Sequence, residues 1–249
     1  MRYTLFKKLH QQPDILVLGN VWDAQSAKIA QEAGYKALGT SSHAIANAMG
    51  YEDGEQITVD EIIFVVEKIV NAVDIPVSID FESGYSDNPD EVAKNVKKLV
   101  DLGVVGINLE DGQVENGKRV LGDMNLHKQK IEAIKSEVKN IFINARVDSY
   151  TTKHKSALEE AITRTKAYTK AGADGIFVPL IESEEDIKSF LDVTSLPLNV
   201  FLTPNLPSIQ QLNKLGVKRL SHGAKIYEYL IKQNTKIFQE FIKEPKLPG

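Results

Sequence analysis

Residues 75–112, IPVSIDFESGYSDNPDEVAKNVKKLVDLGVVGINLEDG, decide the fold that the sequence predicts. Two short, mainly apolar runs, Val77–Ile79 and Gly106–Leu109, have the composition of buried strands, and each is followed by acidic residues. An amphipathic helix beginning at Pro89 is expected between them. A strand, a helix and a second strand in this order form a unit with parallel strands. The acids that follow both strands are therefore expected at the same end of one sheet.

These acids are candidate metal ligands. Asp80 and Glu82 follow the first strand, and Glu110 and Asp111 follow the second. Carboxylates gathered at one edge repel one another unless a cation lies among them, and hard oxygen ligands suit Mg²⁺. We predict that Asp80, Glu82 and Glu110 bind Mg²⁺, directly or through water, whereas Asp111 can pair with a basic residue instead.

The same pattern of helix, glycine and strand recurs along the chain. The segments EAGYKALGT, DLGVVGINL, KAGADGIFV and KLGVKRLSH each place a glycine at a helix end, just before a strand. Eight strands alternating with helices in about 250 residues favour a single closed (β/α)₈ barrel, a TIM barrel, over residues 1–249. An open doubly wound sheet is the alternative, although no GxGxxG turn follows the first strand.

Three further segments carry expectations. Residues 43–57 are small and polar and are expected to form a long loop. Residues 112–125, GQVENGKRVLGDMN, contain three glycines and show no clear periodicity, which indicates a functional or mobile loop. Residues 224–249 are expected to form a helical tail, whose apolar positions suit either a partner subunit or the chain's own barrel wall.

Composition excludes several classes of function. The net charge of −4 gives no electrostatic reason to expect nucleic acid or an anionic membrane as a partner. The absence of cysteine removes disulfides, thiolate metal sites and a catalytic cysteine. The N-terminal stretch lacks the apolar core of a signal peptide, and no apolar run is long enough to span a bilayer. A cytoplasmic location is therefore expected by default.

Polar side chains at the strand ends form the predicted working face, because active sites of such barrels lie at the carboxyl ends of the strands. Arg146 can grip a substrate carboxylate with its planar fork, or it can pair structurally with the nearby acids. Backbone N–H groups of Ser41 and Ser42 can cradle an anion, or both can be plain turn residues. Trp22 is expected either to pack in the core at the rim or to form part of the pocket wall. The isolated histidines form no HxH or HxxxH pair, so none is predicted as a metal ligand.

Taken together, the motifs resemble the isocitrate lyase / phosphoenolpyruvate mutase superfamily, in its shorter phosphonomutase-like (carboxyvinyl-carboxyphosphonate phosphorylmutase-like) branch. The resemblance extends over about residues 20–223, in the segments NVWDAQSAKIAQEAGYKALGTSS, PVSIDFESGY, GVVGINLEDG, INARVDSY, AGADGIFVP and LGVKRLSHG. It implies a (β/α)₈ barrel, often with the last helix exchanged between subunits of a homodimer or homotetramer. It also implies Mg²⁺ and a small anionic carboxylic acid as the substrate.

The resemblance also assigns roles by position. Ser41 and Ser42 match the residues that bind the substrate carboxylate, and Asp53 matches a loop aspartate near the metal. Residues 112–125 match the gating loop, where Glu115 and Lys118 are the available general acids or bases. The remaining matched positions are the acids after the third and fourth strands and the arginine after the fifth, namely Asp80, Glu82, Glu110 and Arg146.

The expected function is a Mg²⁺-dependent lyase that cleaves or forms a C–C bond of a small 2-oxo or 2-hydroxy acid through a pyruvate-like enolate. The gating loop departs from two patterns of the superfamily: it lacks the Lys-Lys-Cys-Gly-His motif of the isocitrate and methylisocitrate lyases, and Asn116 is followed by glycine where the mutases have Asn-Ser. A phosphonopyruvate- or phosphoenolpyruvate-type phosphorylmutase, an oxaloacetate-type C–C hydrolase and a non-catalytic metabolite-binding barrel remain as alternatives.

Overall fold

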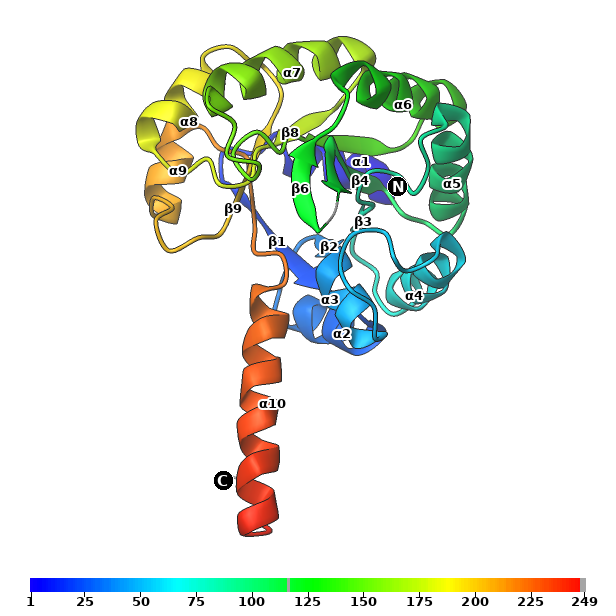
Figure 1. Cartoon of the computed structure of the whole chain (residues 1–249), viewed down its shortest axis with the longest axis vertical. Coiled ribbons are helices and arrows are strands. Elements are labelled where there is room, and N and C mark those ends of the chain that lie inside the picture. The colour runs from blue at the N-terminus through cyan, green and yellow to red at the C-terminus, as the bar shows by residue number, and fades with distance from the viewer. Residues whose placement is uncertain (116, 247–249) are drawn as a thin grey trace.

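The strands close into a barrel. The computed structural model describes residues 1–115 and 117–246. Within them, eight parallel strands follow one another around the barrel in the order β1-β10-β9-β8-β7-β4-β3-β2 (Figure 1). These strands are β1 (Leu16–Val21), β2 (Leu38–Thr40), β3 (Val77–Asp80), β4 (Gly106–Glu110), β7 (Phe142–Arg146), β8 (Gly175–Phe177), β9 (Leu198–Phe201) and β10 (Arg219–Ser221). The predicted (β/α)₈ barrel is confirmed.

Helices surround the barrel and bury their apolar faces against it (Figure 1). Helix α5 shows why the sequence forms them: Asn88 caps its N-terminus by accepting from the Asp90 N–H, Pro89 occupies the first turn, and Val92, Val96 and Leu99 are buried on one face. The helices are α1 (Arg2–Leu9), α2 (Ala24–Glu32), α3 (Ser42–Ala48), α4 (Val59–Asn71), α5 (Pro89–Asp101), α6 (Met124–Glu137), α7 (Ala157–Ala171), α8 (Glu184–Leu191), α9 (Ile209–Leu215) and α10 (Lys225–Lys243).

Helix α1 contributes to the amino-terminal end of the barrel. Its buried residues Phe6 and Leu9 belong to a cluster with residues at the starts of several strands, including Leu16 and Phe142. The Phe6 and Phe142 rings meet edge to face, with centroids 5.4 Å apart. This packing gives the amino-terminal end of the barrel an apolar filling, whereas polar residues lie at the opposite ends of the strands.

Two predicted loops contain regular structure. Residues 43–57 were expected to form a loop, but α3 covers residues 42–48, because the Ser41 hydroxyl caps the Ala44 N–H and Ile45 is buried. In the expected loop 112–125, β5 (Gly112–Glu115) and β6 (Lys118–Leu121) form an antiparallel hairpin. Asn116 lies outside the described residues. Helix α6 then begins at Met124, two residues before the predicted start.

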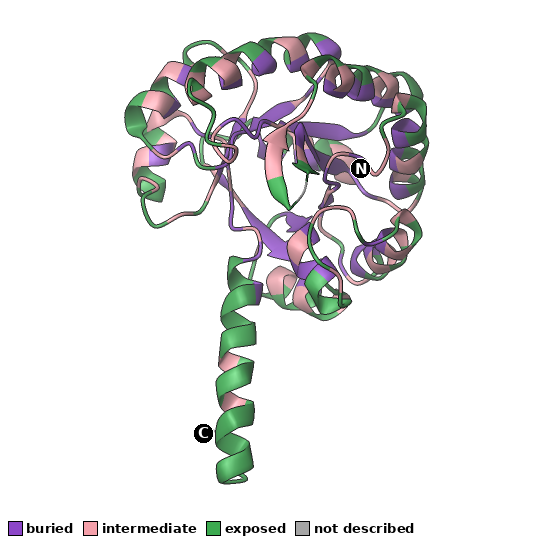
Figure 2. Ribbon diagram, in the orientation of Figure 1, coloured by how far each residue is buried: buried purple, intermediate pink, exposed green. Residues whose placement is uncertain are grey.

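Helix α10 projects away from the barrel, as Figure 1 shows. Tyr227 is its one buried residue, and Figure 2 shows the rest of the helix as exposed or intermediate. Its exposed apolar side chains include Leu230, Phe238 and Phe241, with exposed fractions of 40%, 71% and 42%. The helical tail is present as predicted, and as far as residue 246 it does not lie along the chain's own barrel wall. None of the helices in the described ranges is long and apolar enough to cross a membrane.

Candidate active site

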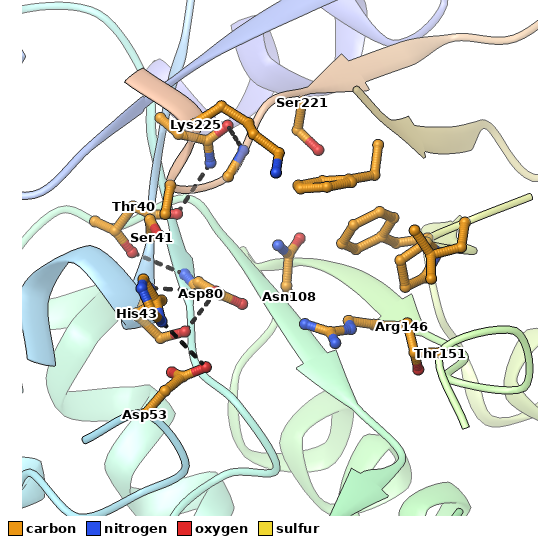
Figure 3. Close-up of a pocket in the computed structure, with 18 of the residues that line it drawn as sticks. Thr40, Ser41, His43, Asp53, Asp80, Asn108, Arg146, Thr151, Ser221 and Lys225 are labelled. Carbon is orange, nitrogen blue, oxygen red and sulfur yellow. Dashed lines mark hydrogen bonds and ion pairs between the residues drawn. The ribbon is translucent and has the colours of Figure 1, made fainter. Parts of the chain in front are cut away.

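A cavity of about 320 Å³ opens at the carboxyl ends of the strands (Figure 3). Its wall combines acidic, basic and amide side chains with the rings of Phe177 and Phe201. Of the residues predicted for the site, five line this cavity: Ser41, Ser42, Asp53, Asp80 and Arg146. Four others, Trp22, Glu82, Glu110 and Glu115, are absent from its wall.

Asp80 occupies the end of β3 and faces the cavity (Figure 3). Its Oδ2 accepts from the Ser42 hydroxyl at 2.8 Å and from the Ser42 N–H at 3.3 Å. Helix α3 thus orients the carboxylate, while Oδ1 accepts no hydrogen bond within the described residues. The Ser42 N–H, predicted to cradle a substrate anion, is directed to this carboxylate instead.

Glu82 is buried behind the cavity wall. Its two carboxylate oxygens accept from the Tyr85 hydroxyl at 2.6 Å and from the Glu55 N–H at 2.8 Å. Burial raises the pKa of Glu82 to about 7, against the lowering effect of the Tyr85 hydrogen bond, and the nearby Asp53 and Asp80 carboxylates add to the rise. The carboxylates of Asp53 and Asp80 therefore lie close enough to that of Glu82 to interact with it electrostatically.

Glu110 lies between two guanidinium groups. Arg119 donates to its Oε1 at 2.6 Å, and the Arg146 Nη1 lies 2.7 Å from Oε2. Both carboxylate oxygens are therefore occupied, and no group of three or more His, Cys, Asp or Glu residues in the described ranges could hold a metal. The structure does not assemble Asp80, Glu82 and Glu110 into the predicted three-carboxylate metal site, because Glu110 binds arginines and Glu82 binds Tyr85 and Glu55.

Asp148 completes this buried ionic cluster. The Arg146 Nε donates to its Oδ1 at 2.9 Å, and the Arg119 Nη1 donates to its Oδ2 at 3.0 Å. Burial alone would raise the pKa of Asp148, but the two guanidiniums outweigh burial and hold it below its ordinary value. Burial raises the pKa of Glu110 despite the same arginines. Of the two acids, Glu110 is therefore the one more readily protonated.

Asp53, Glu115 and Trp22 lie at three different places. Asp53 lines the cavity near His43, whose Nδ1 is 3.7 Å from Asp53 Oδ2. Glu115 is exposed at the end of β5 and does not reach the cavity wall. Trp22 packs edge to face against Tyr227, with ring centroids 5.2 Å apart, and lines a separate apolar groove beside α10. The structure thus places Trp22 at the rim, in contact with the tail helix and outside the substrate cavity.

Several residues of the cavity wall were not predicted from the sequence, among them Asn108, Arg119 and Lys225. The side chain of Arg119 is about a fifth exposed, and its direction depends on the register of the hairpin, in which Arg119 pairs with Val114. The direction of the Asn108 side chain could have been inferred from the sequence, because Asn108 stands between the apolar Ile107 and Leu109 of β4. Alternation along a strand would have placed its side chain inside the barrel.

The phosphoenolpyruvate phosphomutase family matches residues 6–242. The chain belongs to this family. An uncharacterized protein of Mycobacterium tuberculosis is 36% identical over 222 residues, which cover 89% of this chain and 83% of the relative. The 2-methylisocitrate lyase of Bacillus subtilis is 30% identical over 204 residues, which cover 80% of this chain and 66%, slightly under two thirds, of the relative.

A solved structure shows the same fold over nearly the full length of both chains. A proposed phosphonomutase from Burkholderia cenocepacia has a TM-score of 0.90 and 35% identity, with 96% of this chain and 99% of that chain covered. The predicted membership in the isocitrate lyase / phosphoenolpyruvate mutase superfamily is therefore confirmed, and with it the expectation of an enzyme of this lyase and mutase superfamily.

Proposed function

We propose that the protein is a Mg²⁺-dependent lyase that cleaves or forms a C–C bond of a small 2-oxo or 2-hydroxy carboxylic acid through a pyruvate-like enolate. The observation that supports it most strongly is the polarity of the cavity: Asp80 stands on one side, Arg146 on the other, and Asn108 between them (Figure 3). This arrangement offers a cation site and an anion site within one small cavity, as a small oxo or hydroxy acid requires.

The acidic side is suited to a Mg²⁺ ion that keeps most of its water. Mg²⁺ is usually bound through one or two carboxylates, with water and substrate oxygens completing its shell. Asp80 has a free carboxylate oxygen toward the cavity, and Asp53 lines the same wall. When bound there, the ion would supply Lewis-acid stabilisation of negative charge on a substrate oxygen. Glu82 would act behind Asp80 through its charge and not as a direct ligand.

The basic side would hold the substrate carboxylate. The Arg146 side chain is 16% exposed, and the bonds from its Nε and Nη1 to Asp148 and Glu110 fix its plane. A guanidinium has five N–H donors, so this fork retains donors for a substrate carboxylate. Glu110 and Asp148 would position Arg146, and Glu110, whose pKa is raised, is the candidate acid or base next to it.

The hairpin of β5 and β6 would cover the substrate. It lies above β4, and the ionic bonds of Arg119 to Glu110 and Asp148 hold it to the barrel. We propose that the segment 112–125 opens and closes at this contact, as the gating loop expected from the sequence. Closure excludes water from a reacting carboxylate and strengthens its interaction with Arg146. Glu115 is exposed in the described position and would need a movement of the hairpin to act in the reaction.

The test is pyruvate release from a panel of small 2-hydroxy, 2-oxo and phosphono acids, measured with Mg²⁺ and again after its removal with a chelator. Arg146→Met and Glu110→Gln should abolish turnover while the circular dichroism spectrum stays native. Arg2→Met, an arginine on α1 at the opposite end of the barrel, serves as the matched control and should be fully active. Full activity in both site variants, or no binding of oxalate by the wild-type protein, would contradict the proposal.

A phosphorylmutase is the second candidate function, and Lys225 is the observation that favours it. This lysine lines the cavity wall, with its Nζ 5.9 Å from the centre of the Phe201 ring. A second cation in the wall of the same cavity as Arg146 would suit a substrate with a phosphonate or phosphate group. Turnover of phosphonopyruvate or phosphoenolpyruvate, with no reaction of the 2-hydroxy and 2-oxo acids, would select this function.

A further inference from the structure

Arg219 carries a charge deep inside the barrel. It belongs to β10, it is 1% exposed, and no ion pair found among the described residues includes it. Its Nη2 donates to Asn108 Oδ1 at 3.1 Å, whereas Nε and Nη1 are buried without a partner in the described ranges. Burial of an unpaired guanidinium is costly, so a stability role alone does not account for it. Burial lowers the pKa of Arg219 to about 9, and the charge of Asp80 opposes this fall.

The contact of Arg219 fixes the orientation of an amide in the cavity wall. Asn108 Oδ1 accepts a second hydrogen bond, from Asn144 Nδ2 at 2.9 Å. A carbonyl oxygen has two lone pairs, so these two donors saturate it, and a flipped amide would face both of them with its own NH₂ group. The Asn108 Nδ2 makes no hydrogen bond within the described residues and is not among their buried unpartnered atoms. The NH₂ group is therefore the part of Asn108 that is available to the cavity (Figure 3).

We propose that Asn108 donates a hydrogen bond from this NH₂ group to a substrate oxygen, and that Arg219 is the positioning residue that holds the amide in this orientation. The inference rests on the proposed function, which supplies a small carboxylic acid as the substrate. It adds a means of discriminating between substrates at the cavity floor, between Asp80 and Arg146. Substrates with an oxo, hydroxyl or carboxylate oxygen at this place are accepted, and those with a methyl or ammonium group are rejected, because neither accepts a hydrogen bond.

The test measures binding of oxalate to the full chain by titration calorimetry in the presence of Mg²⁺. Asn108→Asp has the same shape but replaces the donor with an acceptor, and it should weaken oxalate binding about tenfold or more. Asn108→Leu should also weaken it about tenfold. Ser78→Ala is the matched control, since its hydroxyl is likewise buried inside the barrel but has no hydrogen-bond partner among the described residues and does not line the cavity. This control should bind oxalate with wild-type affinity.

A double-mutant cycle separates positioning from a general effect of the buried charge. Arg219→Met should weaken oxalate binding about threefold to tenfold in the wild-type background and have no further effect in the Asn108→Leu background, where no amide remains to be oriented. An equal loss in both backgrounds would show that Arg219 acts through its charge or through stability, and would overturn its positioning role. Arg219→Lys takes the place of Arg219→Met in both backgrounds if the methionine variant does not fold.

The outcomes also distinguish this inference from the proposed function. A wild-type protein that does not bind oxalate overturns both. A wild-type protein that binds oxalate, together with Asn108 variants that bind it equally tightly, overturns the inference alone. A structure of the oxalate complex gives an independent reading, in which an oxalate oxygen is expected within hydrogen-bond distance of Asn108 Nδ2. An oxalate that lies away from Asn108 would contradict the inference.

Discussion

Substitution of Arg119 by methionine tests how the hairpin is held to the barrel. Arg119 stands on β6, and its Nη1 bonds both Glu110 Oε1, at 2.6 Å, and Asp148 Oδ2, at 3.0 Å. Methionine keeps much of the aliphatic length but removes both charge-assisted bonds. Within the described residues, Glu110 and Asp148 then have Arg146 as their one remaining cationic partner, so the cluster changes from two carboxylates and two guanidinium groups to two carboxylates and one guanidinium group.

The expected magnitude follows from these two contacts. A hydrogen bond to a charged group contributes about 1.5–3 kcal/mol. Because the Arg119 side chain is 22% exposed, water can replace part of this interaction, and we take about 3 kcal/mol for both bonds together. This free energy corresponds to an increase of about 150-fold in the open fraction of the hairpin. The barrel strands are bonded to one another and should keep their stability.

Hydrogen exchange measures this opening directly. Amides of residues 112–121 should exchange about 100-fold faster in Arg119→Met, while amides of β4 and β7 exchange at wild-type rates. The control is Lys118→Met, on the same hairpin but exposed, which should leave the exchange rates unchanged. If closure is required, turnover of the substrate identified in the panel should fall in proportion to the loss of the closed fraction. Unchanged exchange and turnover in Arg119→Met would refute the reasoning that this contact holds the hairpin closed.

Three further predictions follow from other parts of the chain. Gly112→Ala should lower the free energy of unfolding by about 1–3 kcal/mol in denaturant titrations. The reason is that the added Cβ would collide with the carboxylate of Asp148, which its ion pairs hold in place. Unchanged stability would mean that this carboxylate can move aside. Burial lowers the pKa of His10 to about 3, so the unfolded chain alone takes up its proton below pH 6.5, and stability should fall by about 1.2 kcal/mol from pH 7 to 5.5. His10→Gln should remove that part of the pH dependence, and an unaltered pH profile would contradict the assignment. The family resemblance leads us to propose that α10 contacts a partner subunit in a dimer or tetramer. Leu230→Lys with Phe241→Lys should then give monomers in light scattering, because both side chains are exposed on α10, and a monomeric wild-type protein would refute this contact.

The architecture could be predicted because it depends on patterns that repeat. The strands are short and most are rich in apolar residues, and glycines such as Gly103 and Gly172 mark the helix ends that precede strands. Both glycines have positive φ angles, which non-glycine residues rarely adopt. The helix ends could therefore be recognised in the sequence by their glycines. The same regularity placed Asp80 and Arg146 at the carboxyl ends of their strands, and both line the cavity.

Only some partners of the charged groups could be predicted, because the others depend on distances across the barrel. Glu110 and Arg146 occupy paired positions on β4 and β7, so an ion pair between them could be expected from the sequence. Arg119 reaches the same carboxylate from a hairpin whose strands were not predicted. Its presence occupies the second oxygen of Glu110 and removes it from the predicted metal site.

The polar residues inside the barrel would determine how a substrate is oriented in the site. Asn108 and Asn144 bond each other in a region where an all-apolar interior would be more stable, and Arg219 adds a charge below them. Arg219 and Asn144 both donate hydrogen bonds to Asn108 Oδ1, so the NH₂ group of Asn108 remains available to a molecule bound in the cavity. If a cation is bound at Asp80, a small oxo acid would interact with this cation, with Asn108 and with Arg146 in only one orientation, in which its carboxylate lies toward Arg146. The selectivity of the reaction would therefore be set in the barrel interior as well as in the gating hairpin.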